Sequence, residues 1–312
     1  MPQLHFADSL IEKIRERQTP LVVGIDPRSK QLPSVIRGDT SIESNPQRLA
    51  ELFELFSHEI IDVVAPLVPA IKPQMAFFEE LGPGGMQALA NVIDHAVARD
   101  LMVILDGKRN DIGSTGEAYA RAYLGRKPLS PWGADALTIN PWMGYDTVKP
   151  FSDLAEQRGA GVFVLVKTSN PGSSALQEQV CSEGPLYEQV ATEVERISKE
   201  TAGVSGYGIA GAVVGATYPE QMNNLRTRMP HTLFLVPGFG AQGGSASDVA
   251  GAFDENGFGA VINSSRGIIF AYEHERFAPP SPDQWQRSIE MATREAIEQI
   301  AADTPAGKLR RS

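Results

Sequence analysis

Cysteine is almost absent from this sequence, which contains only Cys181 among its 312 residues. A single cysteine excludes an intrachain disulfide and a cysteine-based metal cluster. Cys181 lies in the polar segment 177–184, and we interpret it as a residue without a chemical role. The five histidines show neither HxxxH nor HxH spacing, so a zinc site or a Ser-His-Asp triad is unsupported. The first apolar run is not followed by a GxGxxG motif, which argues against a dinucleotide site.

The chain also lacks an excess of basic residues, with 28 Lys and Arg against 38 Asp and Glu and a formal net charge of −10. This balance argues against a nucleic-acid-binding surface, which needs a dense basic footprint. No window approaches the ~18 continuous apolar residues of a membrane helix. The N-terminus shows no basic segment followed by an apolar run. We therefore expect a cytoplasmic protein that binds neither nucleic acid nor membrane.

What the sequence does contain is a series of short, nearly continuous apolar runs, each followed by a loop and an amphipathic stretch. Such runs are typical of parallel strands that are covered by helices on their outer face. We expect eight strands, at residues 21–25, 67–71, 101–105, 134–139, 161–166, 209–214, 232–236 and 259–262. Eight β-then-α units favour a closed (β/α)8 TIM barrel, although an open doubly wound sheet shows the same alternation.

The domain organisation follows from the lack of any linker or composition shift along the chain. We expect one barrel domain over residues 1–312, with an N-terminal helix and a frayed polar tail from residue 304. Amphipathic stretches predict further helices at 47–64, 85–98, 187–201, 219–228 and 283–301. Two long connections, 27–45 and 169–186, follow the first and fifth strands, where barrels carry their active-site loops. They are candidate lids or ordinary surface insertions.

Charged residues end three consecutive predicted strands. Asp26 follows the first strand, Lys72 ends the second, and Asp106 and Lys108 end the third. Because residues two apart in an extended chain point to the same side, Asp106 and Lys108 can both face the barrel mouth and interact. Barrel enzymes place their catalytic residues at these strand ends. The succession therefore predicts a catalytic site rather than three solvated strand ends.

The segments that carry these charges resemble the orotidine 5′-phosphate decarboxylase family. The Asp-x-Lys-x-x-Asp arrangement of Asp106, Lys108 and Asp111 is similar to the signature of that family. The segments 24–27 (GIDP) and 72–79 (KPQMAFFE) resemble its first-strand and second-strand motifs, most closely those of the longer bacterial (type 2) subgroup. Related phosphate-sugar barrels share the Asp-x-Lys-x-x-Asp motif, so the three segments together carry the resemblance.

The resemblance implies a carboxy-lyase without cofactor or metal, which converts orotidine 5′-phosphate to uridine 5′-phosphate and carbon dioxide in the last step of de novo UMP biosynthesis. The electron pair left on C6 has no adjacent sink, so a fixed cation must stabilise it and then protonate C6. Lys108 is placed for that task. Asp106 would keep Lys108 protonated or destabilise the substrate carboxylate. Lys72 and Asp111 would complete an alternating array of charges.

The resemblance also implies a homodimer with shared active sites. Asp111, with Ile112 and Thr115 nearby, would then act on the substrate bound by the neighbouring subunit. Ser169, at the end of the fifth strand, resembles the serine that binds the amide edge of the pyrimidine. Asp26 is a further substrate-binding candidate.

A phosphate site is expected in the loops after the seventh and eighth strands, where barrels often bind this group. The seventh-strand loop carries Pro237 and Gln242, and the eighth-strand loop carries Arg266 and Gly267. Arginine offers a planar donor fork to phosphate, and glycine lets the backbone approach closely. By resemblance, Gln242 bridges phosphate and pyrimidine. Ser265 stands where short-chain relatives have glycine.

Two alternative functions stay open at this point. A magnesium-dependent keto-sugar phosphate decarboxylase or hexulose phosphate synthase would share the Asp-x-Lys-x-x-Asp frame, but it needs a carboxylate cluster for its metal, and segment 72–74 argues against that. A catalytically silent nucleotide-binding barrel is the non-enzymatic alternative. The complete set of charged strand-end residues argues against such a loss of activity.

Overall fold

A closed barrel of eight parallel strands forms the centre of the protein, in a computed structural model that describes residues 5–38, 44–182, 184–239 and 246–310. The closed barrel confirms the (β/α)8 expectation over the open sheet. Around the barrel the strands are β1 (Leu21–Ile25), β10 (Ala260–Ser264), β9 (Phe234–Pro237), β8 (Ala210–Val214), β5 (Gly161–Lys167), β4 (Ala136–Ile139), β3 (Met102–Arg109) and β2 (Ala70–Pro73).

Every predicted apolar run overlaps one of these strands. The largest shift in a strand's start is at β2, which begins three residues later than expected, whereas β3 runs four residues past its expected end. The cause of the late start is the end of the preceding helix, because the amide of Val68 still donates to the carbonyl of Val64 at 3.1 Å. Residues 65–68 therefore continue the helical turn before the chain extends.

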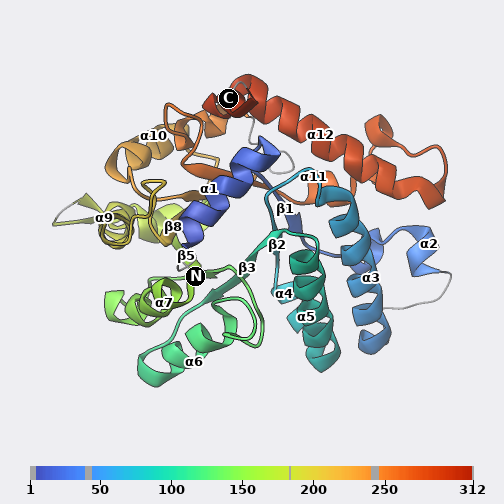
Figure 1. Ribbon diagram of the computed structural model, residues 1–312, viewed down its shortest axis with the longest axis horizontal. Helices are drawn as coiled ribbons and strands as arrows, with labels where there is room; N and C mark the ends of the chain where they lie inside the picture. The colour runs from blue at the N-terminus through green and yellow to red at the C-terminus, as the bar shows by residue number, and fades with distance from the viewer. Residues whose placement is uncertain (1–4, 39–43, 183, 240–245, 311–312) are drawn as a thin grey trace.

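Helices surround the barrel (Figure 1). They are α1 (Phe6–Arg17), α2 (Ser34–Arg37), α3 (Pro46–Val64), α4 (Ala76–Glu79), α5 (Gly82–Ala98), α6 (Gly113–Tyr123), α7 (Tyr145–Arg158), α8 (Ser174–Gln177), α9 (Leu186–Glu200), α10 (Pro219–Arg228), α11 (Arg266–Ile269) and α12 (Trp285–Asp303). The five predicted helices are confirmed with starts and ends within three residues. The connection after β5 also holds a small antiparallel pair, β6 (Val180–Cys181) and β7 (Gly184–Pro185).

Local sequence explains where the long helix α3 begins. The side chain of Asn45 accepts a hydrogen bond from the amide of Arg48 at 3.0 Å, and Pro46 occupies the first turn. This side-chain cap satisfies an amide that has no partner within the helix, and proline needs none there. Phe53 and Phe56 lie on the buried face of the helix.

The expected N-terminal helix, α1, closes one end of the barrel. It lies across the barrel in Figure 1, and Phe6 packs edge-on against Phe163 of β5, with ring centroids 5.9 Å apart. A Cβ at Gly161 would lie 2.2 Å from the Phe6 ring, so this close packing requires glycine. The opposite end, where the strands terminate, is the mouth.

The prediction of a frayed tail is wrong for the described part of the chain. Residues Pro305–Arg310 form a 3-10 helix that buries Ala306 and Leu309. Arg310 also pairs with Glu298 of α12, with 2.6 Å between nitrogen and oxygen. The polar composition of the tail concealed two apolar side chains that are enough to dock it.

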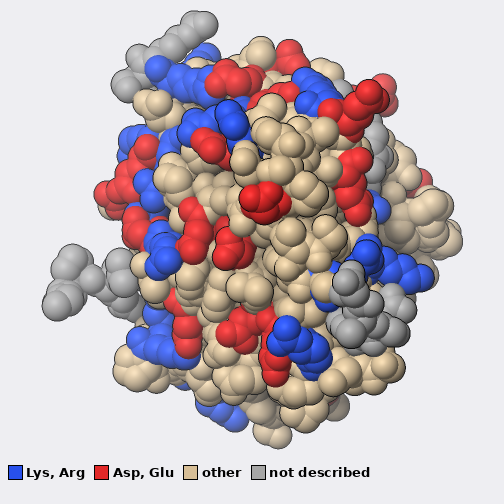
Figure 2. Space-filling view, turned by 90° about the vertical axis from the view of Figure 1, so that its right-hand side faces the viewer, with Lys and Arg blue, Asp and Glu red and all other residues tan. Residues whose placement is uncertain are grey.

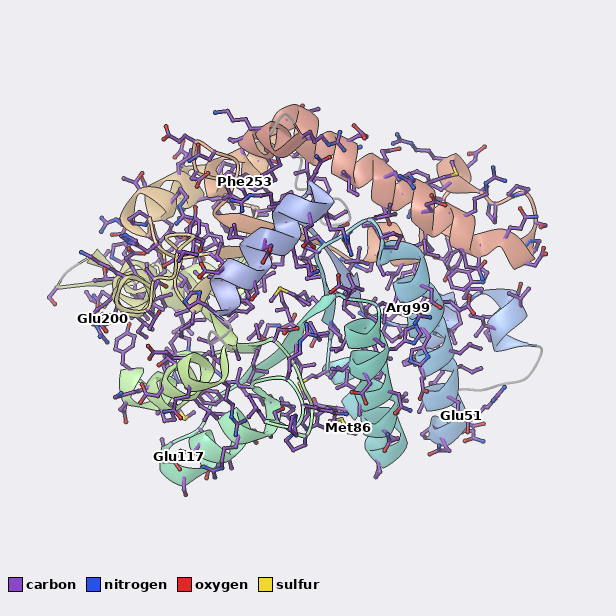
Figure 3. All side chains as sticks on the ribbon, viewed as in Figure 1. Glu51, Met86, Arg99, Glu117, Glu200 and Phe253 are labelled. Atoms are coloured by element: carbon purple, nitrogen blue, oxygen red, sulfur yellow. The ribbon has the colours of Figure 1, made fainter. Side chains whose placement is uncertain are left out.

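Charges of both signs lie together on one face of the molecule. The face drawn in Figure 2 carries acidic and basic side chains interspersed. Figure 3 shows the labelled Glu51, Glu117 and Glu200 on the outer helices, and all three are exposed. Among the described residues, no helix combines the length and the apolar character needed to cross a bilayer.

Candidate active site

Lys72, Asp106 and Lys108 meet at the barrel mouth. One carboxylate oxygen of Asp106 lies 2.7 Å from Nζ of Lys72, and the other lies 2.6 Å from Nζ of Lys108. The predicted contact between Asp106 and Lys108 is thus confirmed. Lys72 and Asp106 are buried, whereas 47% of the Lys108 side chain is exposed. Lys108 is therefore the member of the trio that a bound molecule can reach.

Burial and charge act in opposite directions on the two buried groups. Burial alone raises the pKa of Asp106, but the ammonium groups of Lys72 and Lys108 outweigh it and hold that pKa far below its usual range. Burial alone lowers the pKa of Lys72, but Asp106 and then Asp26 outweigh it, so the net pKa is raised. Each group therefore keeps its charge because the other is present.

Sequence reasoning missed two further partners of Asp106. Nε2 of Gln74 donates to one carboxylate oxygen at 3.0 Å, and the hydroxyl of Thr138 donates to the other at 2.9 Å. Gln74 stands two residues after Lys72, so the same-side rule that grouped Asp106 with Lys108 also points to Gln74. Thr138 lies in β4 among apolar neighbours, and no comparable signal marks it.

Asp26 lies at the same mouth but does not join the ion pairs. It lines a cavity of about 420 Å³ together with Gln74, Asp106 and Lys108. A volume of this size is typical of a small-molecule site. Oδ1 of Asp26 is buried and finds no hydrogen-bond partner in the described structure. It is an acceptor that a ligand hydroxyl could satisfy.

Asp111, Ile112 and Thr115 lie apart from this cluster within the chain. The carboxylate of Asp111 accepts a hydrogen bond from the amide of Ile112 at 2.7 Å. None of the described contacts joins Asp111 to Lys72, Asp106 or Lys108. Ile112 is 63% exposed, and Thr115 is exposed as well. The three residues present themselves outward at the start of α6.

The end of β5 carries Ser169 and a second buried lysine. Lys167 is 1% exposed, and its Nζ lies 3.1 Å from Oγ of Ser173 and 3.2 Å from a carboxylate oxygen of Glu178. Both partners belong to the loop after β5, so Lys167 ties the base of this candidate lid to the barrel. Ser169 packs against Gly215, where a Cβ would lie 2.9 Å from the serine backbone.

The two strands that lead into the expected phosphate loops end side by side. Pro237 ends β9 and pairs in register with Asn263 of β10, and Arg266 and Gly267 open the short helix α11. Oδ1 of Asn263 is buried and has no partner in the described structure. Gln242, the predicted bridge between phosphate and pyrimidine, lies outside the described residues.

A second arginine, which sequence reasoning did not single out, lies near Arg266. The guanidinium of Arg28 sits 3.3 Å from the centre of the Phe77 ring. The pKa of Arg28 is lowered, chiefly by burial and further by the nearby positive charge of Arg266, against the opposing effect of Asp26. Both positive charges would favour an anion bound in their vicinity. Within the described residues, no three His, Cys, Asp or Glu side chains group as metal ligands.

Comparisons with known proteins agree with this geometry. The family model described as "Orotidine 5'-phosphate decarboxylase / HUMPS family" matches residues 19–278. Orotidine 5′-phosphate decarboxylase of Rhodopirellula baltica is 51% identical over 298 residues, which cover 95% of this chain and 98% of that protein. Orotidine 5′-phosphate decarboxylase of Deinococcus radiodurans is 40% identical over 267 residues, which cover 85% of this chain and 89% of that protein. The solved structure of Leishmania donovani OMP decarboxylase superposes with a TM-score of 0.73 at 32% identity. The match covers 99% of this chain and 100% of that protein.

Proposed function

This chain belongs to the orotidine 5′-phosphate decarboxylase / HUMPS family, and on that premise we propose that it converts orotidine 5′-phosphate to uridine 5′-phosphate and carbon dioxide. The observation that carries the proposal is the buried array of Lys72 and Asp106, which directs the half-exposed Lys108 toward the cavity at the mouth. A cytoplasmic location stays a prediction.

Lys108 is the proposed proton donor. When the bond between C6 and the carboxylate breaks, carbon dioxide leaves and the electron pair stays on C6. The ammonium of Lys108 stabilises this pair and then gives it a proton, which leaves a neutral amine and uridine 5′-phosphate. Solvent can return the proton, because Lys108 keeps 47% of its side chain exposed.

Asp106 and Lys72 fix the charges before the substrate arrives. Asp106 holds the ammonium of Lys108 in place through the 2.6 Å contact. Lys72 compensates the negative charge of Asp106 on its other side at 2.7 Å, so the carboxylate stays ionised although it is buried. Charges that need no rearrangement during the reaction are the most effective electrostatic catalysts.

The remaining candidates divide between the two ends of the substrate. Arg266, with Gly267 and Pro237 in the adjoining loops, would bind the phosphate, and Arg28 adds positive charge beside it. Ser169 would bind the pyrimidine. The orphaned oxygen of Asp26 suits a ribose hydroxyl, which can donate a hydrogen bond to it. Binding of the distant phosphate then supplies free energy to order the loops around the ring.

The outward position of Asp111, Ile112 and Thr115 supports a homodimer with shared sites. An exposed isoleucine next to a carboxylate without a cationic partner in the described contacts fits a surface that a second copy covers. Mixing inactive Lys108→Ala with inactive Asp111→Asn protein tests the arrangement. Random pairing restores one complete site in each mixed dimer, so about a quarter of wild-type activity returns. No recovery after verified subunit exchange would contradict shared sites.

The first test of the reaction follows the loss of orotate ultraviolet absorbance when purified protein meets orotidine 5′-phosphate in the presence of EDTA. We expect rapid loss with wild type and a kcat roughly 10³-fold lower for Lys108→Ala, since both a proton donor and a charge are removed. Activity that disappears on adding EDTA would favour the metal-dependent sugar-phosphate alternative. Nucleotide binding by folded protein without turnover would instead point to a silent barrel.

A further inference from the structure

The backbone at Lys108 has an unusual conformation. Its φ is +47°, and the other non-glycine residues with positive φ in the described chain are Gln18 and Asp100. Those two follow the ends of α1 and α5, where left-handed residues are common. Lys108 instead lies inside β3, next to an irregularity in the pairing with β4 between Leu105 and Arg109. A lysine in this conformation carries strain that its surroundings must offset.

The neighbouring strand β4 supplies the restraint. The amide of Lys108 donates to the hydroxyl oxygen of Thr138 at 2.9 Å, and the carbonyl of Lys108 accepts from Nδ2 of Asn140 at 3.0 Å. Both polar groups of the strained peptide are therefore held by side chains of β4 or the residue after it. The same Thr138 hydroxyl lies 2.9 Å from Oδ1 of Asp106, the oxygen that also binds the Lys108 ammonium.

The chemistry of the groups fixes the direction of each hydrogen bond. An ionised carboxylate only accepts and a backbone amide only donates, so the single hydroxyl proton of Thr138 must point to Asp106. The lone pairs of the hydroxyl then face the Lys108 amide. Thr138 is 1% exposed, so water has little access to take over either role. One buried hydroxyl thus connects the backbone of Lys108 with the counter-ion of its ammonium.

We infer that Thr138, assisted by Asn140, is a positioning residue that sets where the Lys108 ammonium lies. It acts through Lys108 and Asp106 and does not itself touch the substrate. The inference rests on the proposed function and extends it by a residue on β4. A displacement of about 1 Å at a reacting group can cost a large part of the rate. Holding the backbone of the proton donor in place therefore keeps kcat high.

The matched pair Thr138→Val and Thr138→Ser tests this inference. Valine keeps the shape but removes one hydrogen bond to a charged group and one to an amide, so we expect kcat to fall about 10- to 100-fold. KM and the Kd of uridine 5′-phosphate should stay within about threefold, because binding contacts are untouched. Serine keeps the hydroxyl and should restore kcat to within about threefold. In a Lys108→Ala background, Thr138→Val should cause no further loss.

Three results would overturn the inference. They are an unchanged kcat in Thr138→Val, a serine variant as slow as the valine variant, and a full additional loss in the Lys108→Ala background. Should Thr138→Val fail to fold, Asn140→Ala takes its place, because it releases only the carbonyl of Lys108. A lower kcat at unchanged KM supports the inference there, and an unchanged kcat contradicts it.

A binding measurement separates this inference from the proposed function. An analogue of uridine 5′-phosphate with an oxyanion at C6 places negative charge where the Lys108 ammonium should lie, as the reacting carbanion does. Thr138→Val should bind this analogue about 10- to 100-fold more weakly and uridine 5′-phosphate equally well. Wild-type protein without turnover would contradict the proposed function, whereas an unchanged ratio of the two affinities in Thr138→Val would contradict the inference alone.

Discussion

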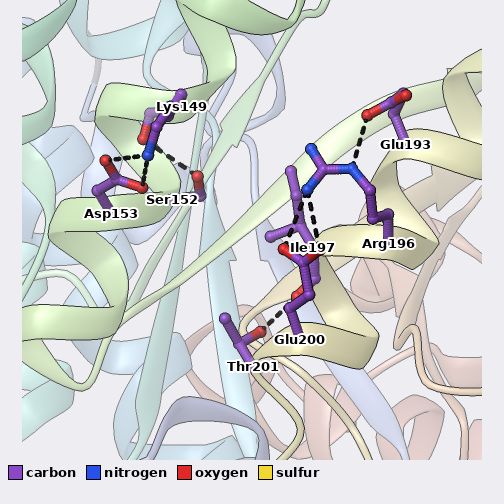
Figure 4. Close-up of polar contacts among 8 residues, drawn as sticks. All are labelled: Lys149, Ser152, Asp153, Glu193, Arg196, Ile197, Glu200 and Thr201. Atoms are coloured by element: carbon purple, nitrogen blue, oxygen red, sulfur yellow. Dashed lines mark hydrogen bonds and ion pairs between the residues drawn. The ribbon is translucent and has the colours of Figure 1, made fainter.

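Charged side chains gather both at the barrel mouth and in a groove on the outer wall, between α7 and α9 (Figure 4). At the mouth, Lys72 and Asp106 are 34 positions apart in sequence and almost fully buried. In the groove, Arg196 and Glu200 are one helical turn apart, 3.0 Å from each other, with 52% and 60% of their side chains exposed. The nitrogen-to-oxygen distances differ by only a few tenths of an ångström, so distance does not distinguish the two regions.

What distinguishes them is the cost of breaking each pair. Exposed pairs such as Arg196 with Glu200, and likewise Lys149 with Asp153, are screened by water and can re-solvate when a partner is lost. At the mouth, a charge that loses its partner stays buried without compensation. The groove cluster is a solvated helix surface, and the mouth cluster is a preorganised array. Mutations that remove one partner should therefore separate the regions clearly.

The largest effect is expected for Asp106→Asn. Asparagine has the shape of aspartate, but it leaves the buried ammonium of Lys72 without its anion, so the free energy of unfolding should fall by about 3–5 kcal/mol. The same variant should lower kcat roughly 10²- to 10³-fold, because Lys108 loses its fixed partner. Urea unfolding and the absorbance assay measure the two quantities. A loss of stability no larger than that of a surface variant would show that Lys72 does not depend on Asp106.

The pH dependence of this difference in stability sharpens the comparison. The pKa of Asp106 is lowered in the folded protein, so its contribution is present above the unfolded pKa of about 4 and is lost as pH falls through the folded value. The pKa of Lys72 is raised, so its contribution is complete below about 10.5 and is lost as pH rises through the folded value. We expect the stability gap between wild type and Asp106→Asn to shrink as pH falls below about 4, where the carboxylate of the unfolded wild type takes up a proton. If the gap already closes near pH 6 as the pH falls, the pKa of Asp106 is not lowered in the folded protein.

The sequence predicted the barrel and three charged strand ends because both depend on short-range patterns. Apolar runs define the strands, and parallel strands bring Lys72, Asp106 and Lys108 to one edge whatever the details of packing. The contacts of Asp106 with Thr138 were not foreseen, since they depend on the register between β3 and β4 and on the irregularity beside Lys108. The left-handed backbone conformation of Lys108 was not foreseen either, because a lysine in the sequence gives no sign that its φ will be positive.

Lys167 shows that the sequence pattern also does not predict whether a charged side chain is buried. As a residue that ends a strand, it could be an exposed charge or a buried one, and no role could be assigned to it from the sequence. The structure buries it because Ser173 and Glu178, which lie further along the same loop, fold back to provide partners. Local pattern places a residue at a strand end, whereas tertiary contacts decide whether water reaches it.

The ion pair of Lys167 with Glu178 is intermediate in exposure between the pairs at the mouth and those in the groove, because 35% of the Glu178 side chain is exposed. Lys167→Met removes one charged anchor of the loop after β5, and Ser169 lies in that loop. We therefore expect a KM about tenfold higher with a smaller change in kcat. Lys167→Arg keeps the charge and serves as the control. Steady-state kinetics and limited proteolysis of residues 168–186 measure the result. An unchanged KM with unchanged proteolysis would show that the loop does not depend on this anchor.

The smallest effect is expected for Arg196→Ala in the groove. Arg196 pairs with Glu193 and Glu200 of its own helix, and all three side chains are at least one-third exposed. The free energy of unfolding should change by no more than about 0.5 kcal/mol, and kcat should stay within about twofold. Added salt should reduce the remaining difference in stability from wild type, because exposed pairs are screened and buried ones much less so. A loss comparable to that of Asp106→Asn would mean that exposure does not decide the strength of an ion pair in this barrel, and the contrast between mouth and groove would fail.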